Sequence, residues 1–586
     1  MYKSSLRSLD EHSANNEVAG STQASRRGRR NRGVDLATFV LHWSLVAALA
    51  LSFLSGMRIA ADATDAGLSR LIAVAAPQGD VFFMHLLSAG VLVALLAGYT
   101  VVLMLTNRWR RILMSPRRIV ASFRETNGPR WRSVNAIAYW FGTLSMILAM
   151  ATGLYKYVMP GWFPAERVSD IHRLAAWCIL GYPLLHVLAQ AGIGGWQQLK
   201  RMLTFAVRFI GQEHSGLCAI ALVLALLYGV HTSLATDLVI ERVETPPTLD
   251  GRPEDQIWKR SAITSVRTFG GVNLPGGETT VDVRAVHDGE RAWFLFEWDD
   301  PTRSLKHLPL IKTEAGWKVM QTGFDRHDED VYYEDKFAVM LSATGKAPAS
   351  GTVHLGESPL AGRPGPAGGR GLHYTTDGSI ADVWHWKAVR SGQSMGLADD
   401  NHFGPPMEPY TIDPHFWRRA PVQGHEEGVI RYTGGYEKDW HSGGGVGMNW
   451  EIFNSELVTP LRLPADPGVL FALGRPDLTP HTSDIGRWWI EVDESLPYTP
   501  EDDHYRVGTI LPSVLLKGPM TGDRADVAAQ ASWADGRWRL EMSRVLDTGS
   551  RDDVELSDGV YLWVAVFDHS QTRHSRHLHP IRLVFR

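Results

Sequence analysis

At 586 residues the chain is too long for one ordinary domain, and its formal net charge of -4 is small for that length. Such a small net charge argues against a general nucleic-acid binder. The two cysteines, Cys178 and Cys218, both lie in apolar stretches, and no CxxCH motif occurs. These observations exclude covalent c-type haem attachment, cysteine zinc sites and a disulfide framework.

The chain up to about residue 240 is strongly apolar and is predicted to lie in a membrane. Residues 1–34 end in an arginine-rich run and are expected to form a disordered basic tail on the cytoplasmic side. Crossing a bilayer takes about 20 apolar residues. Five stretches qualify: approximately 36–57, 81–105, 134–158, 172–193 and 217–237. Residues 35–240 are therefore predicted to form an all-α membrane bundle of five transmembrane helices.

Basic residues in the loops predict the orientation of these helices. The loop after the second helix carries many arginines, and the loop after the fourth carries Lys200, Arg201 and Arg208, whereas the loops after helices one and three hold few bases. By the positive-inside rule the N-terminus is cytoplasmic and the chain after the fifth helix lies outside. In a bacterium this predicts a multi-pass inner (plasma) membrane protein, in contact with membrane lipid, with a periplasmic C-terminal domain.

Residues 241–586 are predicted to form an all-β sandwich, because short β-type runs alternate with turn signals. The runs include TTVDVRAV, RAWFLFEW, KFAVMLS, RWWIEVD, RWRLEMSRVL and VYLWVAVF. Within this domain, residues 342–450 form a long insertion that is rich in Gly, Pro and His and shows little periodicity. A loop of this length in a compact domain is usually functional or disordered.

Four histidines in the apolar half form a regular arrangement. The fourth apolar stretch reads HRLAAWCILGYPLLH, in which His172 and His186 stand fourteen residues apart. On a helix they lie about 21 Å apart along the axis and about 40° apart around it, so both imidazoles point to one side at opposite membrane depths. His42 lies towards the cytoplasmic end of helix one, and His85 towards the periplasmic end of helix two. Their predicted depths in the membrane therefore pair His85 with His172 and His42 with His186.

Placing an imidazole in the hydrocarbon core of a membrane costs free energy, so a histidine there is expected to have a function. A single such histidine can also form a hydrogen bond that packs two helices together. Two imidazole pairs on opposite leaflets suit two non-covalent haems b in a four-helix core. Bis-histidine ligation fills both axial positions, so such haems carry electrons rather than activate substrates. Arg173, beside His172, is a candidate partner for a haem propionate, and an ordinary interfacial arginine is the alternative.

Residues 34 to about 240 resemble the bacterial cytochrome b561 family and the related b-type subunits of hydrogenases and formate dehydrogenases. The resemblance rests on LHWSL in helix one, FFMHLLSAG in helix two and the two-histidine fourth helix. It implies that His42, His85, His172 and His186 are the haem iron ligands. It further implies exchange of electrons with membrane quinone or quinol.

Residues 242–586 resemble the haem-binding domain of the ethylbenzene dehydrogenase gamma subunit and its dimethyl sulfoxide dehydrogenase relatives. The matching pieces are PTLDG, VRAVHDGERAWFLFEWDDPTRS, YYEDKFAVML, ADVWHWKA and RWRLEMSRVLDTGSRDDVELSDGVYLWVAVFD. The resemblance implies a β-sandwich that holds one further b-type haem, ligated in the best-known relatives by methionine and lysine. The segment before ADVWHWKA holds His354 and His373 instead of an evident methionine. Candidate ligands are therefore His354 or His373, with Lys517, Met340 or Met395 opposite.

Other uses of this half stay open or are not predicted. The histidines of the insertion fit no HExxH or H-x-H zinc pattern, and a polar loop with scattered histidines is the alternative. The HDED run at 327–330 lacks the EF-hand pattern, so no calcium site is predicted from it. Eight tryptophans suit either sugar stacking or a packed core. They are Trp293, Trp298, Trp384, Trp386, Trp488, Trp489, Trp538 and Trp563.

The sequence therefore predicts a b-type cytochrome that transfers electrons between the quinone pool and a periplasmic partner protein, with no catalytic residue assigned. One alternative is a periplasmic ligand-binding or sensing module on a cytochrome anchor, without a third haem. Another is an enzyme whose outer domain reduces ferric chelates or superoxide.

Overall fold

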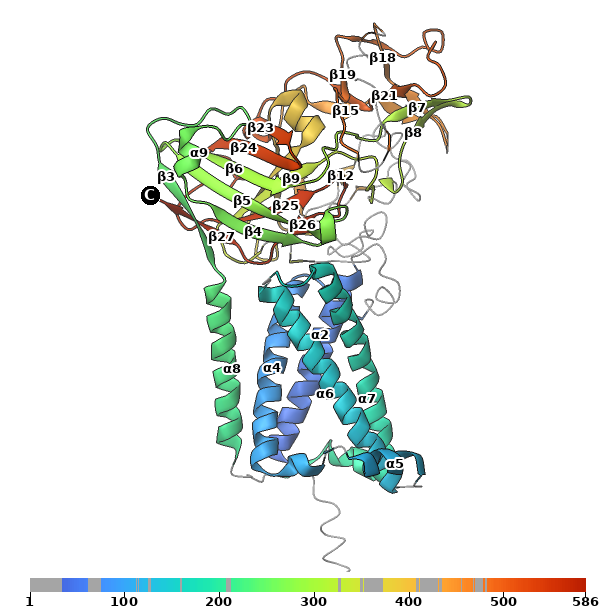
Figure 1. The fold of residues 1–586 in the computed structure, drawn as a ribbon, viewed down its shortest axis with the longest axis vertical. Helices are drawn as coiled ribbons and strands as arrows, with labels where there is room; N and C mark the ends of the chain where they lie inside the picture. Colours follow the sequence, from blue (N-terminus) through green and yellow to red (C-terminus); the bar gives the residue numbers. More distant parts are fainter. Residues whose placement is uncertain are drawn as a thin grey trace, which may run out of the picture. The chain divides into compact units, whose positions relative to one another are not determined.

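The computed structural model describes most of the two halves of the chain. The described residues are 34–61, 75–111, 115–124, 128–158, 161–206, 212–324, 328–347, 351–352, 373–406, 435–454, 456–466 and 482–586, with short pieces at 113, 410–411, 430–431, 468 and 478–479. The predicted tail of residues 1–34 and the candidate ligand His354 thus lie outside the described residues, apart from Val34. The chain divides into two compact units, one built mainly from the long helices and one mainly from the strands (Figure 1).

Among the described residues, five helices are long and apolar enough to cross a membrane. They are α2 (Leu36–Ala61), α4 (Val81–Leu105), α6 (Gly128–Val158), α7 (Ala165–Arg201) and α8 (Glu213–Ser233). This confirms the five predicted spans. The fourth was predicted too short, because its first turns carry the polar residues AERVSD, which an apolar window leaves out. Many leucines on these helices are exposed, including Leu174, Leu184 and Leu222, as a lipid-facing surface requires.

Small residues bring two of the helices together. A Cβ atom added at Gly98 of α4 would lie 2.9 Å from the carbonyl oxygen of Gly216 in α8, so this crossing needs glycine.

Helix α7 is irregular near its end. Pro183 lies within the helix, whereas the non-helical backbone angles fall at Gly194 and Gly195. Proline in a membrane helix is tolerated where neighbouring groups satisfy the freed carbonyl.

Short helices and one small strand pair connect these elements. The short helices are η1 (Arg108–Arg111), α5 (Pro116–Arg124), α9 (Gln256–Arg260), η2 (Pro275–Gly277), η5 (Ala388–Gln393) and η6 (Asp523–Ala525). The pair consists of β1 (Val34–Asp35) and β2 (Phe205–Ala206), which run parallel.

A 13-stranded sheet forms the centre of the C-terminal domain. Its strands are β3 (Thr236–Arg242), β4 (Thr264–Phe269), β5 (Glu278–His287), β6 (Arg291–Asp299), β9 (Lys336–Ser342), β10 (Ala381–Lys387), β11 (Asp399–Phe403), β14 (Tyr436–Lys438), β23 (Ala528–Ala534), β24 (Arg537–Val545), β25 (Tyr561–Phe567), β26 (Ser575–Arg576) and β27 (Ile581–Phe585). The main path runs β14-β11-β10-β9-β25-β26-β4-β5-β6-β24-β23, and β27 and β3 pair off it. Most pairs are antiparallel, and the sheet folds over on itself as a sandwich.

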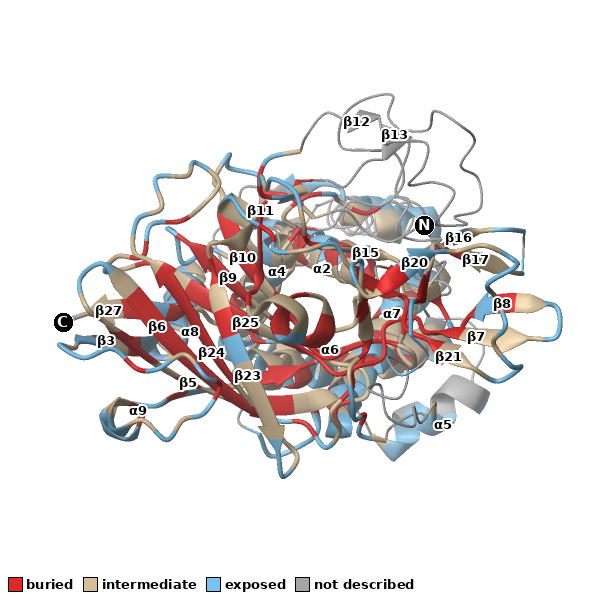
Figure 2. Ribbon diagram, turned by 90° about the horizontal axis from the view of Figure 1, so that it is seen from above, coloured by how far each residue is buried: buried red, intermediate tan, exposed pale blue. Residues whose placement is uncertain are grey.

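The sandwich core is aromatic. Trp298 of β6 lies 4.7 Å from Phe337 of β9 and 6.3 Å from Trp538 of β24, measured between ring centroids, and Trp386 of β10 lies 5.0 Å from Trp538. Strands from both halves of the sheet thus meet across one buried layer, shown in red in Figure 2. Of the eight tryptophans considered for sugar stacking, all but Trp489 are buried. Core packing is therefore the role of these seven side chains.

Smaller sheets complete the domain around a second apolar cluster. One contains β16 (Trp450–Ile452), β17 (Val458–Pro460), β8 (Gly316–Val319), β7 (Leu310–Thr313) and β21 (Ile510–Leu511). Another contains β15 (Val446–Met448), β22 (Val514–Leu516) and β19 (Trp489–Glu491), and two pairs join β18 (Arg462–Pro464) with β20 (Ser495–Pro497) and β12 (Tyr410–Thr411) with β13 (Ile430–Arg431).

The expected loop-rich insertion of residues 342–450 contains strands of the main sheet. Strand β10 pairs with β9 from Asp382 to Lys387, and β11 extends the sheet further. The sequence ADVWHWK was not recognised as a strand because both of its faces are covered, which removes the polar alternation of a half-exposed strand. The insertion is thus interrupted by core strands, and only part of it is loop.

Candidate functional site

His85 and His172 face each other within the helical unit. His85 lies in the second turn of α4 and His172 in the second turn of α7, and their ring centroids are 6.3 Å apart with an interplanar angle of 85°. A metal–nitrogen bond of about 2.0 Å and about 1.1 Å from nitrogen to ring centre put two imidazoles on opposite sides of one metal ion at about 6 Å. The spacing of this pair therefore fits axial ligation of one haem iron.

Hydrogen bonds fix the orientation of both rings through Nδ1. In His85, Nδ1 lies 2.9 Å from the carbonyl oxygen of Ser52, which can only accept a proton. In His172, Nδ1 lies 2.9 Å from Oγ1 of Thr152, and that hydroxyl already donates its proton to the carbonyl of Leu148. Both rings thus carry their proton on Nδ1 and present the lone pair of Nε2. This is the usual arrangement of metal-binding histidines.

The second predicted pair, His42 and His186, comes from α2 and α7. The two side chains lie within range of electrostatic interaction, and the ring of Tyr182 stands 5.6 Å from that of His186. Nδ1 of His186 is buried and has no hydrogen-bond partner among the residues described. The ring of His42 in turn lies 5.5 Å from that of Trp43. The structure therefore brings this pair into one neighbourhood, where each ring contacts an aromatic side chain of its own helix.

Arg173, the candidate propionate partner, is half exposed in an ion pair. Its guanidinium lies 2.5 Å from Oδ1 of Asp170, one helical turn earlier on α7. Such exposed pairs contribute little to stability, so the guanidinium can exchange this partner for another anion. The structure thus supports neither reading of this arginine over the other.

The candidate ligands in the C-terminal domain fall into separate places. Met395 and Lys517 line one cavity of about 640 Å³, together with Leu397, Leu516, Pro519 and Met520. A cavity of that size lies within the range of sites for cofactors and drug-sized ligands. Lys517 is exposed and Met520 is buried.

Met340 and His373 do not line this cavity. Met340 packs with Ala381, Val383 and Trp563 in an apolar cluster on the outer side of β9. Nδ1 of His373 lies 2.6 Å from the carbonyl oxygen of Thr352. Of the ligands predicted for the sandwich, those that the structure describes are His373, Met340, Met395 and Lys517, and among these it brings together only Lys517 and Met395.

His385 of β10 is one of the insertion histidines considered for metal binding, but the buried face that it shares with Lys387 was not predicted from the sequence. Trp384 and Trp386 point into the core, so His385 between them points to the opposite face, where its ring stacks on Phe567 at 5.4 Å. Lys387 lies on that same face, and burial lowers its pKa to about 8. The alternation of aromatic and basic residues in WHWK, in which every second side chain points to the same face of a strand, could have predicted this face from the sequence.

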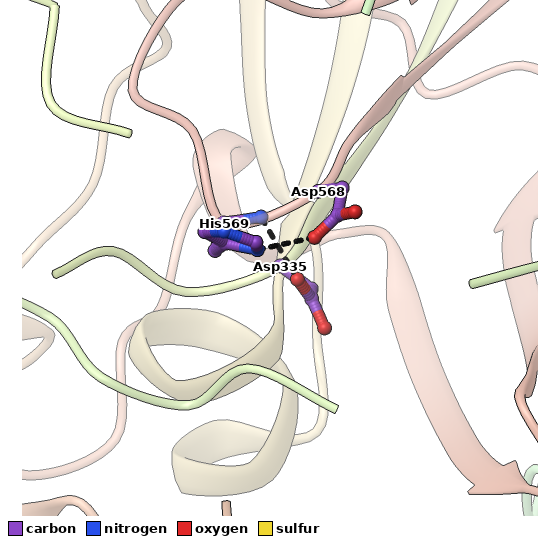
Figure 3. A group of neighbouring side chains, drawn as sticks. All are labelled: Asp335, Asp568 and His569. Atoms are coloured by element: carbon purple, nitrogen blue, oxygen red, sulfur yellow. Dashed lines mark hydrogen bonds and ion pairs between the residues drawn. The ribbon is translucent and has the colours of Figure 1, made fainter. Parts of the chain in front are cut away.

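Asp335, Asp568 and His569 form the most buried group with metal-binding side chains (Figure 3). The oxygens of Asp335 accept hydrogen bonds from the backbone N–H of Ser304 (2.7 Å), the backbone N–H of His569 (3.0 Å) and the indole N–H of Trp538 (3.1 Å). Burial and the charge of Asp568 raise the pKa of Asp335 to about 8. Because these lone pairs are already engaged, the group is best explained as a structural joint between chain segments.

The apolar helices, the paired histidines and the appended β-sheets define a membrane-bound b-type cytochrome with a β-sandwich domain. The profile of the family described as prokaryotic cytochrome b561 matches residues 33–205, and that of the family described as ethylbenzene dehydrogenase matches residues 255–578. The second match spans more than half of the chain. The chain therefore belongs to the ethylbenzene dehydrogenase family and carries a cytochrome b561 domain before the sandwich, which confirms the predicted fusion.

Other comparisons add little. No curated protein matches the chain. Among solved structures, a carbohydrate-binding module of family 9 from Caldicellulosiruptor kristjanssonii in complex with glucose has a TM-score of 0.21 and 10% identity, and covers 59% of this chain and 96% of that chain. The same module in complex with cellotriose has a TM-score of 0.22 and 9% identity, and covers 60% and 95%. At these TM-scores the likeness carries no argument about this chain.

Proposed function

We propose that the protein transfers electrons between membrane quinol and a periplasmic redox partner, through two bis-histidine haem b sites in the helical domain. The observation that carries the proposal is the His85–His172 pair, whose 6.3 Å ring separation and Nδ1 hydrogen bonds fit axial ligation. Haem b, when bound, supplies a reversible one-electron carrier. The two residues contribute the axial nitrogens and, through Ser52 and Thr152, a fixed ring orientation.

The second haem site is assigned to His42 and His186. The fourteen-residue spacing on α7 places His186 about 21 Å along the helix from His172, at ~1.5 Å per residue. Two electron carriers at the two leaflets would let electrons cross the bilayer. Together with the arginine-rich loop after α4, this supports a bacterial inner-membrane protein with a cytoplasmic N-terminus and a periplasmic sandwich.

For the sandwich we propose a third haem b, in the cavity lined by Met395 and Lys517. A methionine sulfur and a lysine amine in one cavity match the ligand types that the family resemblance implies. Lys517 is exposed, so its amine keeps the freedom to turn towards a ligand. Met340 is less suitable because it is already packed among apolar side chains in a different cluster.

Two alternatives remain for the sandwich. As a binding or sensing module it would hold no haem, and as a reductase of ferric chelates or superoxide it would need a haem with an open or exchangeable position. The cavity of about 640 Å³ is compatible with both, since it would accept other ligands of similar size. Haem content and ligand binding separate the three functions.

The test uses the full-length protein, purified in detergent. Haem per chain is measured by pyridine haemochrome, and haem reduction is followed by absorbance after adding a soluble quinol. We expect three haems b in the wild type, all reduced by quinol, and two in Lys517→Ala and in Met395→Ala. Lys318→Ala, which changes an exposed lysine on β8, is the control and should keep three.

Each other outcome has a definite meaning. A wild-type count of two would remove the third haem and favour the binding module. A haem that binds cyanide or carbon monoxide in the fully folded protein would favour the reductase. A protein whose haems quinol cannot reduce would contradict the proposed quinol reaction itself.

A further inference from the structure

An acidic group lies inside the sandwich domain, apart from the haem ligands considered above. Asp382 of β10, Asp400 of β11 and Asp553 in the loop after β24 present carboxylate oxygens within 4.8 Å of one another. Arg544 of β24, which is fully buried, lies 2.5 Å, 3.8 Å and 3.6 Å from them. One guanidinium thus faces three carboxylates, and Asp526 adds a fourth in contact with Asp400.

Several oxygens of this group lack hydrogen-bond donors. Asp400 is 0% exposed, and its Oδ2 accepts no hydrogen bond from any residue in the described ranges. The same holds, within that part of the chain, for both oxygens of Asp526 and for Oδ1 of Asp553. Buried carboxylate oxygens nearly always have a donor, so this is an observation separate from the mere abundance of acid.

The Asp335 group provides the contrast within the same domain. Asp335 is as buried as Asp400, yet its carboxylate accepts three N–H groups. At Asp400 and Asp526, two carboxyl groups instead lie within hydrogen-bonding range of each other, and no N–H or hydroxyl group of the described residues donates to Oδ2 of Asp400 or to either oxygen of Asp526. Such a contact is stable only with a shared proton or with a cation that both oxygens bind.

We propose that a divalent cation of the calcium class binds among Asp523, Asp526 and Asp553, beside the buried carboxyl group of Asp400. Asp523, Asp526 and Asp553 place oxygens within 4.8 Å of one another and are all partly exposed, which gives an ion a route in. Calcium takes six to eight oxygen ligands in flexible geometry, and carboxylates can bind it through one oxygen or two. The group contains no cysteine or histidine, the ligands that zinc prefers.

The cation would relieve an electrostatic cost that is visible in the protein alone. Burial raises the pKa of Asp526 to about 6, and burial together with the charge of Asp382 raises that of Asp553 to about 7. At neutral pH these carboxyls therefore ionise against the cost of burial and, to a smaller extent, the charge of neighbouring carboxylates. Because β11, the segment at 523–526 and the loop at 553 all contribute, the bound ion would hold three chain segments together.

The experiment uses the full-length protein in detergent, freed of metal by a chelator. Calcium chloride is titrated in by calorimetry, and thermal unfolding of the sandwich is followed with and without calcium. We expect about one calcium ion per chain and a higher melting temperature when calcium is present. Asp526→Asn should weaken calcium binding at least tenfold, and it should melt no lower than the wild type in chelator, because an amide can donate to Asp400.

A control and a second variant keep the result interpretable. Glu501→Gln removes an exposed carboxylate elsewhere in the domain and should bind calcium as the wild type does. If Asp526→Asn does not fold, Asp553→Asn carries the same expectation of at least tenfold weaker binding. No calcium binding by the wild type, or unchanged affinity in these Asp→Asn variants, would overturn the proposal and leave a shared proton as the occupant.

Discussion

The hydrogen bond between Thr152 and His172 gives a quantitative prediction for the membrane half. Thr152→Val keeps the shape of the side chain but removes the oxygen that accepts the Nδ1–H of His172 at 2.9 Å. That hydrogen bond makes the imidazole a stronger electron donor to a bound metal. Ferric iron benefits from this donation more than ferrous iron, so its loss should raise the midpoint potential of one haem.

The size of the shift follows from the strength of one hydrogen bond. A neutral hydrogen bond contributes a net ~0.5 to 1.5 kcal/mol. Because about 1.4 kcal/mol corresponds to about 59 mV for a one-electron couple, and only the part of this energy that differs between ferric and ferrous iron counts, the potential should rise by at most roughly 60 mV. The other membrane haem should keep its potential.

The assay is a redox titration of the full-length protein, followed by the absorbance of the reduced haems. Thr100→Val on α4 is the matched control, because the Thr100 hydroxyl donates to the carbonyl of Leu96 and should leave both potentials unchanged. A lowered potential, or an equal shift of both haems, would refute the assignment of Thr152 as the acceptor that orients His172.

A glycine beside His172, a proposed haem ligand, and one buried ion pair give two further predictions. Gly153→Val should remove about one haem per chain in the haemochrome assay, because a Cβ atom at Gly153 would lie 3.3 Å from Cε1 of His172. Gly181→Ala is the control and should keep all haem, because a Cβ atom at Gly181 would have no described atom within 4 Å. Burial lowers the pKa of His402, but the hydrogen bond and charge of Asp439 raise it on balance. The ion pair between His402 and Asp439 therefore stabilises the fold fully below about pH 6.5, and this stabilisation is lost as the pH rises through the raised pKa of His402. In denaturant titrations, His402→Gln should thus reduce the fall in unfolding free energy between about pH 6 and 8. An unchanged pH profile would contradict the ion pair.

The membrane half was largely predictable because its signals are local. A span needs about 20 apolar residues in a row, and the spacing of His172 and His186 follows from helix geometry alone. The contacts that orient the rings were not predictable. Thr152 stands twenty residues before His172 on a different helix, and only the packing of α6 against α7 brings them within 2.9 Å.

The sandwich was predictable as a class, but its sites were not. A strand with one partly exposed face, such as β5, shows the alternation that identifies it. Strand β10 lacks it because both faces are covered. The aspartates of the proposed cation site come from positions 400 to 553, so their meeting depends on the pairing of distant strands, which no short motif records.

The most direct test of the central claim is which histidines hold the same haem. Haem per chain is measured by pyridine haemochrome in full-length His85→Ala, His172→Ala and the double variant, and then in His85→Ala/His186→Ala. We predict that the first three each lose one haem, and that the double variant loses no more than either single one. The combination with His186→Ala should lose two. Loss of two haems in His85→Ala/His172→Ala, or of none in the single variants, would contradict the pairing on which the account rests.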